Sequence, residues 1–332
     1  MSDARAWALI LAAGEGSRLR TLTTTASGLS VPKQFCSLRG GRALLEEAVR
    51  RASAVAPLER ICLVVAAQHR RWWAPLLDTL PPENVIEQPE NRGTAYGILL
   101  PLLQIAACDS AATVVVFPAD HYVRDEAALA IALREAVAIA GADRDAACLL
   151  GVEPDEPDTE LGYIVPAERR YHRASAVVEF IEKPFLNRAC ALLDQGALWN
   201  VFILASSAKA LLALYESRFD STIARLRAVI ASCRHEPLRA AATAAIYRDL
   251  QSLDFSRDVL EGQEAALRVL RVPDCGWTDL GTLPRVARTL YRLPNEALAG
   301  RSDPNSFLRL NLAVQHSLLK TSGKLGFHPG AA

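Results

Sequence analysis

The sequence has no excess of charge of either sign, and this absence excludes a broad class of partners. Lysine and arginine together number 37, as do aspartate and glutamate, so the formal net charge is zero. Non-specific binding to nucleic acid or to a membrane surface depends on a basic field. We therefore expect no nucleic-acid partner, and an anionic ligand has to be held by a local site.

Long apolar runs and closely spaced cysteines are also missing. A membrane span needs about 20 apolar residues, whereas the start, MSDARAWALILAAG, places only about eight before a glycine turn. The seven cysteines are odd in number and too scattered for a zinc site or a disulfide framework. These absences predict a cytoplasmic protein with reduced thiols, no secretion signal and no membrane partner.

Apolar, β-branched runs alternate with helical patterns along the first half of the chain. Strands are expected at 7–12, 61–66, 84–87, 113–117 and 147–152, and helices at 42–55 and 126–140. Further on, short strands are expected at 163–165, 176–182, 200–204 and 266–273, and helices within 206–250 and 281–293. The pattern predicts an α/β fold whose ligands collect beyond the carboxyl ends of the strands. We expect a mixed, mostly parallel sheet flanked by helices, with a small β extension and a helical C-terminal segment.

The first strand runs into a glycine-containing turn, ILAAGEGSRLRTL at 10–22. Gly14 and Gly16 allow the backbone to approach an anion closely, and Arg18 supplies a planar cation. A dinucleotide-binding motif needs a third glycine where Leu19 stands, and a P-loop needs Gly-Lys-Ser/Thr, which is absent. On these residues alone, the segment is either a nucleotide loop of a third kind or a plain turn.

A second segment, VPKQF at 31–35, changes this interpretation. G-E-G-S-R-L followed by P-K-Q-F resembles the signature of the sugar-1-phosphate nucleotidyltransferases. The residues P-K-Q-F in particular resemble the mannose-1-phosphate guanylyltransferase branch. Further matches follow in order: QPENRGTAYGIL (88–99), FPADHYV (117–123), LGYIV (161–165), FIEKP (180–184), LWN (198–200), DFSRDVLE (254–261) and GWTDLG (276–281). The resemblance covers roughly residues 6–290.

The resemblance implies a Rossmann-like nucleotidyltransferase fold and a defined reaction. GTP and a sugar 1-phosphate, with mannose 1-phosphate favoured, would give a GDP-sugar and pyrophosphate. Residues 1–290 would form the nucleotidyltransferase domain, with a nucleotide half at about 1–152 and a sugar-binding half at about 153–290. Residues 291–332 would form a C-terminal helical segment and tail. No β-helix or cupin-like extension follows residue 290, so we expect no bifunctional isomerase, and the surface helices permit a homodimer without requiring one.

The implied chemistry is an in-line attack of the sugar phosphate on the α-phosphorus, which needs cations and geometry and no protein nucleophile. In the family pattern, Arg18 and Lys33 match phosphate-binding cations, and Asp120 and Asp279 match carboxylates that hold Mg²⁺. Without the resemblance, a helix N-cap explains an aspartate at a strand end as well as a metal ligand does. His121 is expected to be structural, because the attacking phosphate is already ionised.

The resemblance also assigns the remaining residues to binding sets. The catalytic set is Arg18, Lys33, Asp120 and Lys183. The nucleotide-binding set is Ala12, Ala13, Gly14, Glu15, Gly16, Ser17, Gln88, Arg92, Gly93 and Thr94, with Gln88 at the base. The sugar-binding set is Gly162, Glu182 and Asn200, with Lys183 on the sugar phosphate. Without the resemblance, Thr94 caps a helix start and Glu182 and Lys183 form a surface charge pair.

Two departures from the family pattern stand out. Thr21 occupies a position where many relatives carry proline, and Val201 and Phe202 replace a small pair, which predicts a narrower or differently shaped sugar site. Another sugar or nucleotide is the nearest alternative. Two other classes remain open: a catalytically weak homologue that binds nucleotide sugar and regulates a partner, and an NAD-dependent dehydrogenase. The retained charges argue against the first, and the missing third glycine argues against the second.

Overall fold

The computed structural model describes residues 5–25, 28–38, 41–76, 80–168, 173–232 and 236–292. The chain divides into two units. The first contains Met1–Gly14, Ala48–Ala119 and Val123–Trp277, and the second contains Glu15–Glu47, Asp120–Tyr122 and Thr278–Ala332. The predicted tail lies outside the described residues from 293 onwards, and the domain boundaries expected at about 152 and 290 stay predictions.

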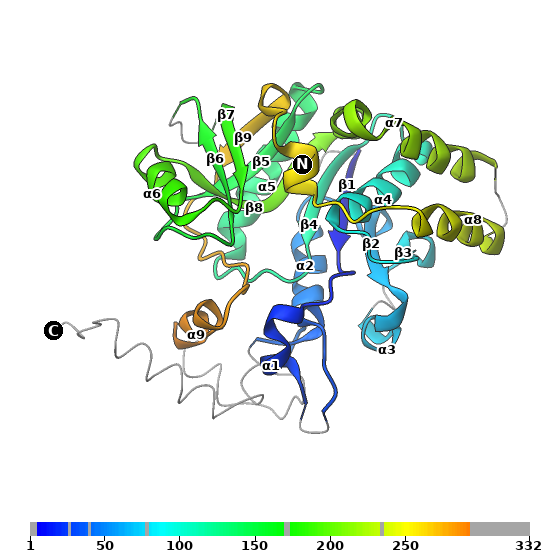
Figure 1. Cartoon of the computed structure of the whole chain (residues 1–332), viewed down its shortest axis with the longest axis horizontal. Helices are drawn as coiled ribbons and strands as arrows, with labels where there is room; N and C mark the ends of the chain where they lie inside the picture. The colour runs from blue at the N-terminus through cyan, green and yellow to red at the C-terminus, as the bar shows by residue number, and fades with distance from the viewer. Residues whose placement is uncertain are drawn as a thin grey trace. The chain divides into compact units, whose positions relative to one another are not determined.

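A nine-stranded sheet lies in the first unit, in the order β3-β2-β1-β4-β8-β5-β9-β7-β6, with an additional pairing of β8 and β6 (Figure 1). The strands are β1 (Ala6–Leu11), β2 (Ile61–Ala66), β3 (Val85–Gln88), β4 (Thr113–Pro118), β5 (Ala147–Val152), β6 (Gly162–Pro166), β7 (Ser175–Glu182), β8 (Leu198–Ser207) and β9 (Leu267–Arg271). The first four strands pair in parallel. β8 runs antiparallel to β4 and β5, and β7 runs antiparallel to β6 and β9.

The helices are α1 (Arg20–Thr23), α2 (Leu44–Ala52), α3 (Arg70–Trp73), α4 (Thr94–Cys108), α5 (Glu126–Ala142), α6 (Leu186–Asp194), α7 (Ala208–Ser232), α8 (Glu236–Arg248) and α9 (Leu283–Tyr291). α7 is kinked at Phe219, whose φ of −131° and ψ of 23° are not helical. A π-helical segment, η7, runs over Phe255–Leu260. The predicted α/β class is therefore confirmed.

Helices cover the sheet on both faces, which explains the unbroken apolar runs of β2 and β4, where every residue is buried. α4, α7 and α8 pack in one large cluster with alternate strand residues such as Val114 and Val116. α5 packs on β4, β5 and β8. Leu129 and Leu133 of α5 are buried but do not belong to that cluster, because α5 covers the opposite face of the sheet. The β extension has a smaller cluster around Tyr163 and Trp199.

The second unit consists of short elements. The 3₁₀ turn η1 (Ser17–Leu19) leads into α1, and η2 (Lys33–Phe35) precedes α2. An isolated bridge joins Tyr122 to Thr278, and α9 follows, capped by the Thr282 hydroxyl. Within the described part of the chain, no helix combines the length and the apolar character that crossing a lipid bilayer requires.

Candidate active site

The glycine loop of the second unit is shaped by Gly16, which caps η1 in the left-handed region with a φ of 61°. A Cβ at this position would lie 2.9 Å from the main-chain nitrogen of Lys33. Only glycine therefore allows the loop to lie against η2. Glu15, Ser17 and Arg18 lie on this loop, and Glu15 and Arg18 are exposed, so the loop is accessible to an anion.

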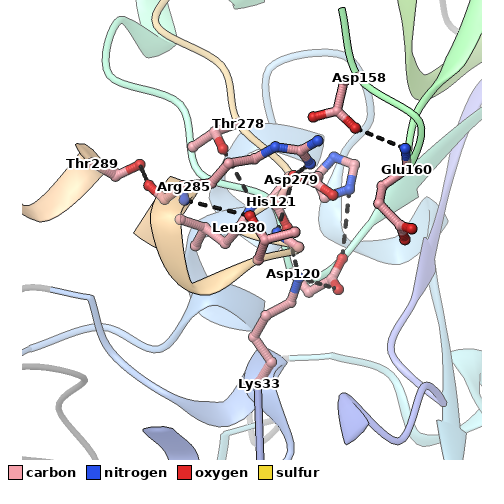
Figure 2. Close-up of polar contacts among 12 residues, drawn as sticks. Lys33, Asp120, His121, Asp158, Glu160, Thr278, Asp279, Leu280, Arg285 and Thr289 are labelled. Carbon is pink, nitrogen blue, oxygen red and sulfur yellow. Dashed lines mark hydrogen bonds and ion pairs between the residues drawn. The ribbon is translucent and has the colours of Figure 1, made fainter. Parts of the chain in front are cut away.

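In the second unit, the side chain of Lys33 points toward Asp120 and Asp279 (Figure 2). The residue is only 6% exposed. Its Nζ lies 2.8 Å from Oδ2 of Asp120 and donates a hydrogen bond of 2.6 Å to the main-chain oxygen of Asp279. The two predicted carboxylate residues, which are far apart in sequence, are thus held by one buried ammonium group.

Asp279 is fixed by a tight turn that leads into α9. Its Oδ1 accepts hydrogen bonds from the Gly281 amide, at 3.0 Å, and from the guanidinium of Arg285. A Cβ on residue 281 would lie 2.2 Å from Oδ2 of Asp279, and Leu280 adopts a positive φ of 50°. Positive φ in a non-glycine residue is costly, and such strain collects at functional sites. The turn therefore holds the Asp279 carboxylate at the expense of local strain.

The two carboxyl groups respond differently to their surroundings. Burial alone would raise the pKa of the Asp120 carboxyl group. The charges of Lys33 and His121 lower this pKa by more than burial raises it, so it lies below its ordinary value. For Asp279, burial raises the pKa, with Lys33 opposing and Asp120 adding to the rise. Arg18 also lies near enough to lower the pKa of Asp279. The cluster consequently couples both carboxyl groups to predicted phosphate-binding cations.

In the first unit, the predicted base contact Gln88 is the last residue of β3 and is 3% exposed. Its Nε2 has no hydrogen-bond partner among the described residues. A buried amide without a partner costs free energy unless a ligand or water satisfies it. The carboxamide faces α4, because its Oε1 lies 4.0 Å from the position that a Cβ on Gly97 would occupy. The carboxamide also lies close enough to the Tyr247 hydroxyl to oppose the rise that burial causes in the Tyr247 pKa. A ligand at Gln88 would therefore share the carboxamide with Tyr247.

The start of α4 is built on Gly93, which has a φ of 86° and serves as N-cap. Thr94 does not cap the helix; its hydroxyl accepts a hydrogen bond of 2.8 Å from the amide of Phe255. The capping interpretation of Thr94 was therefore wrong, because the hydroxyl is committed to the first residue of η7. Arg92 is also committed, since its guanidinium donates to the carboxylate of Glu90 and to the main-chain oxygen of Arg248.

The predicted sugar-binding residues converge at the junction of β6, β7 and β8. Gly162 pairs with Glu182 in the sheet register. A Cβ on Gly162 would lie 2.5 Å from Oε2 of Glu182 and 3.4 Å from Cβ of Asn200, so glycine permits the three residues to meet. Oδ1 of Asn200 accepts a hydrogen bond of 3.0 Å from the amide of Phe202. This bond turns Nδ2 of Asn200 toward Gly162, where it is available as a donor.

Lys183 follows Glu182 with a positive φ of 52°, although it precedes a proline and would ordinarily be extended. Such a conformation costs on the order of 1–3 kcal/mol. Nζ of Lys183 lies 3.4 Å from Oε1 of Glu182, whose side chain is only 10% exposed. The pair is therefore no surface charge pair of the ordinary kind.

A family model described as nucleotidyl transferase matches residues 7–293. The chain belongs to the nucleotidyl transferase family. The resemblance stated from the sequence motifs is thereby confirmed, as is the fold class.

This nucleotidyl transferase is 29% identical over 283 residues to the xanthan biosynthesis protein XanB of Xanthomonas campestris, a match that covers 82% of this chain and 57% of the relative. It is 30% identical over 304 residues to the mannose-1-phosphate guanylyltransferase ManC of Salmonella typhimurium, covering 85% of this chain and 59% of the relative. A crystal structure of a mannose-1-phosphate geranyltransferase from Thermus thermophilus shares 26% identity. It superposes with a TM-score of 0.72, covering 87% of this chain and 80% of that one. The chain thus spans less than two thirds of the length of the two curated relatives.

The structure of the nucleotidyl transferase brings predicted residues together in three groups. Lys33, Asp120 and Asp279 form one group in the second unit; Gln88 and Gly93 lie around the start of α4 in the first unit. Gly162, Glu182, Lys183 and Asn200 form the third. Ala12 and Ala13 are buried just after β1, and Gly14 is exposed beside them.

Sequence reasoning missed two residues of these groups. Arg285 binds Asp279, and Glu261 accepts a hydrogen bond from the amide of Glu182. An arginine in the first turn of a helix is usually a solvent-exposed charge, so no local signal marked Arg285. Glu261 was visible as the last letter of DFSRDVLE, a motif to which no role was assigned.

Proposed function

We propose that this protein transfers a nucleotidyl group from GTP to mannose 1-phosphate, giving GDP-mannose and pyrophosphate. The observation that carries the proposal is the buried Lys33 ammonium, which binds the Asp120 carboxylate and the main chain of Asp279. The choice of base and sugar is supported by the relatives named mannose-1-phosphate guanylyltransferase, such as that of Salmonella typhimurium.

The reaction needs no nucleophile from the protein. An oxygen of the sugar phosphate forms a bond to the α-phosphorus, and the bond from that phosphorus to the bridging oxygen of pyrophosphate breaks. Negative charge grows on the departing pyrophosphate, so fixed cations supply most of the stabilisation. We assign this role to Lys33 and Arg18, while His121, with Nε2 3.7 Å from Oδ1 of Asp120, flanks the carboxylate and moves no proton.

Mg²⁺ fits the donor set of the second unit. Among the described residues, no three His, Cys, Asp or Glu side chains gather as a complete metal cage. Mg²⁺ is usually held by one or two carboxylates together with substrate phosphates and water. Asp120 and Asp279 supply such a pair. Lys33 binds one carboxylate oxygen of Asp120, and Arg285 binds one carboxylate oxygen of Asp279. When bound, the ion would neutralise phosphate charge and orient the phosphates.

The first unit supplies recognition of the base and the sugar. The buried Nε2 of Gln88 is the proposed donor to an acceptor on the base. On the sugar side, Nδ2 of Asn200 donates and the carboxylate of Glu182 accepts, which suits a hexose hydroxyl that does both. Lys183, whose Nζ lies 3.4 Å from Oε1 of Glu182, is the proposed cation for the sugar phosphate.

The first experiment is pyrophosphate release measured over a grid of nucleoside triphosphates and sugar 1-phosphates with Mg²⁺. We expect the highest kcat/KM for GTP with mannose 1-phosphate. A maximum for another pair would keep the reaction and overturn the assigned specificity. No turnover with any pair, from folded protein that binds nucleotide, would favour a regulatory homologue.

The metal assignment has its own test. Asp120→Asn removes the charge that the Mg²⁺ proposal needs, and we expect kcat to fall by at least about 100-fold, as for other losses of electrostatic stabilisation. Asp274→Asn is the matched control, because Asp274 is a highly exposed carboxylate paired with Arg124. Near-normal turnover of Asp120→Asn, with an unchanged Mg²⁺ requirement, would contradict the assignment.

A further inference from the structure

Glu261 is the residue that leaves the π-helical segment η7, and its main chain is fixed on both sides. Its amide donates a hydrogen bond of 3.1 Å to the oxygen of Ser256, five residues earlier, which is the π-helical pattern. Its main-chain oxygen accepts a hydrogen bond of 2.9 Å from Arg218, which also donates to the oxygen of Asp258 at 2.7 Å. The backbone of Glu261 therefore has little freedom.

The segment is anchored equally well at its other end. Leu253 exchanges main-chain hydrogen bonds with the start of α4, since its amide donates to Arg92 and its oxygen accepts from Ala95. The Asp254 carboxylate caps η7 by accepting from the Arg257 amide, and the Asp258 carboxylate accepts from the Asp254 amide at 2.6 Å. Residues 253–261 thus form a segment that connects α4 to β7 and is held by hydrogen bonds at both ends.

The Glu261 side chain reaches the end of β7. One of its carboxylate oxygens accepts a hydrogen bond of 2.5 Å from the main-chain amide of Glu182. The next amide, of Lys183, donates to the oxygen of Leu161 at 3.2 Å. These two bonds hold consecutive amides where the chain leaves β7 and Lys183 takes its positive φ.

We propose that Glu261 is a positioning residue that fixes Glu182 and Lys183 for binding of the sugar 1-phosphate, an inference that rests on the proposed function. Glu261 is joined to the main chain of Glu182 and acts through it. The strained turn at Lys183 persists only where its surroundings determine it, and the Glu261 carboxylate is one of the groups that does so. Loss of this contact lets the Glu182–Lys183 peptide relax and moves both side chains.

This role predicts a particular pattern among substitutions of one residue. Glu261→Gln keeps an oxygen that accepts the same bond, whereas Glu261→Asp is one methylene shorter and Glu261→Ala has no acceptor. Glu264→Ala is the matched control, because Glu264 lies on the neighbouring turn and its carboxylate accepts a hydrogen bond of 3.0 Å from the Gly262 amide, not from an amide of β7. The rescue by glutamine separates a hydrogen bond from a requirement for charge.

The test is steady-state pyrophosphate release with each substrate varied in turn. For Glu261→Ala and Glu261→Asp, we expect the KM of the sugar 1-phosphate to rise about tenfold, equivalent to about 1.4 kcal/mol. The KM of the nucleoside triphosphate should stay within about twofold, and Glu261→Gln and Glu264→Ala should behave as wild type. An amide chemical shift of Glu182 measured by NMR gives a readout without turnover; it should move in Glu261→Ala and be retained in Glu261→Gln.

The outcomes separate this inference from the function beneath it. Inactive wild-type protein would overturn the proposed function and the positioning role together. Active wild type with an unchanged sugar-phosphate KM in Glu261→Ala would overturn the positioning role alone. Equal loss in Glu261→Gln and Glu261→Ala would also overturn it, because charge and not the hydrogen bond would then matter. If Glu261→Ala does not fold, the comparison of Glu261→Asp with Glu261→Gln decides.

Discussion

At the scale of single residues, Glu182 shows the strongest conflict between burial and charge among the proposed sugar-binding residues. Burial raises the pKa of its carboxyl group from about 4.5 to about 7, Asp254 adds to the rise and Lys183 opposes it. A carboxyl with this pKa changes charge near neutral pH, where its capacity to accept a hydrogen bond from a sugar hydroxyl changes as well. The charged form of Glu182 is therefore costly to bury.

The pKa of Glu182 predicts how stability depends on pH. Because the folded protein holds this proton more tightly than the unfolded chain, the stabilisation is present below pH 4.5 and is lost as pH rises to about 7. Each pKa unit is worth about 1.4 kcal/mol, so the loss is on the order of 3 kcal/mol. Glu182→Gln removes the ionisation and should make the protein more stable than wild type at pH 8.

Urea denaturation at pH 5 and pH 8 measures this difference. The gain of Glu182→Gln over wild type should be larger at pH 8 than at pH 5. Glu264→Gln, at the control position, measures the effect of replacing a carboxylate by an amide elsewhere. The same gain at both pH values would mean that burial does not perturb Glu182. The sugar-phosphate KM of the variant should rise even as stability improves.

Sequence reasoning identified the residues of the proposed sugar site but not their burial or their hydrogen bonds. The motifs placed Gly162, Glu182 and Asn200 in one set, and the structure brings them together. The burial of Glu182 and the use of Oδ1 of Asn200 by the Phe202 amide depend on strands β6, β7 and β8 meeting, which no single motif contains. The expected narrowing by Val201 and Phe202 stays a prediction, although the Phe202 ring packs edge-on against Phe255.

At the scale of elements, the start of α4 depends on a glycine that approaches another chain segment. Gly93 has a positive φ, and a Cβ there would lie 2.1 Å from the main-chain oxygen of Leu253. Gly93→Ala should therefore destabilise the protein by at least about 2 kcal/mol, since strain and steric overlap act together. Thermal or urea unfolding measures the loss.

Gly97, one turn further along α4, provides the matched control. A Cβ on Gly97 would meet Leu11 at 3.9 Å and Gln88 at 4.0 Å, which are ordinary contacts. Alanine is favoured over glycine inside a helix by about 1 kcal/mol, so Gly97→Ala should be neutral or stabilising. If both variants lose the same stability, the contact with Leu253 does not explain the requirement at residue 93.

The predicted elements succeeded where burial alone determines structure. β2 matches its predicted range, and β4 extends it by one residue, because continuous apolar runs identify strands covered on both faces. β8 runs from 198 to 207, beyond the predicted 200–204, since its ends pair with β6 and β4. The motif DFSRDVLE did not predict the π-helical geometry of its segment, because two of the segment's partners, Thr94 and Arg218, are distant along the chain.

At the scale of the whole molecule, the distribution of thiols predicts how the protein reacts with alkylating agents. Burial raises the pKa of Cys62 and Cys148 to about 12 and that of Cys275 to about 11. Among the described cysteines, Cys108 and Cys190 are exposed. Since the thiolate is the reactive form, the buried thiols should be inert at pH 8 in the folded state.

Alkylation followed by peptide mass spectrometry tests this expectation. Cys108 and Cys190 should be modified first in native protein, and Cys62, Cys148 and Cys275 only after denaturation. The denatured sample is the control for intrinsic reactivity. Modification of Cys62 at the rate of Cys190 would show that the sheet opens far more readily than its burial indicates.

The wider π turn at Phe255–Leu260 also bears on how such sequences diverge by insertion and deletion. Each residue of an α-helix turns the chain by about 100°. Deleting one residue from the segment would therefore swing Glu261 to another side, even if every remaining letter of DFSRDVLE were kept. A homologous protein with that deletion would retain Gly162, Glu182, Lys183 and Asn200 but lose the hydrogen bond between Glu261 and the Glu182 amide. The contact with Glu182 therefore depends on the number of residues in this segment as well as on the identity of Glu261.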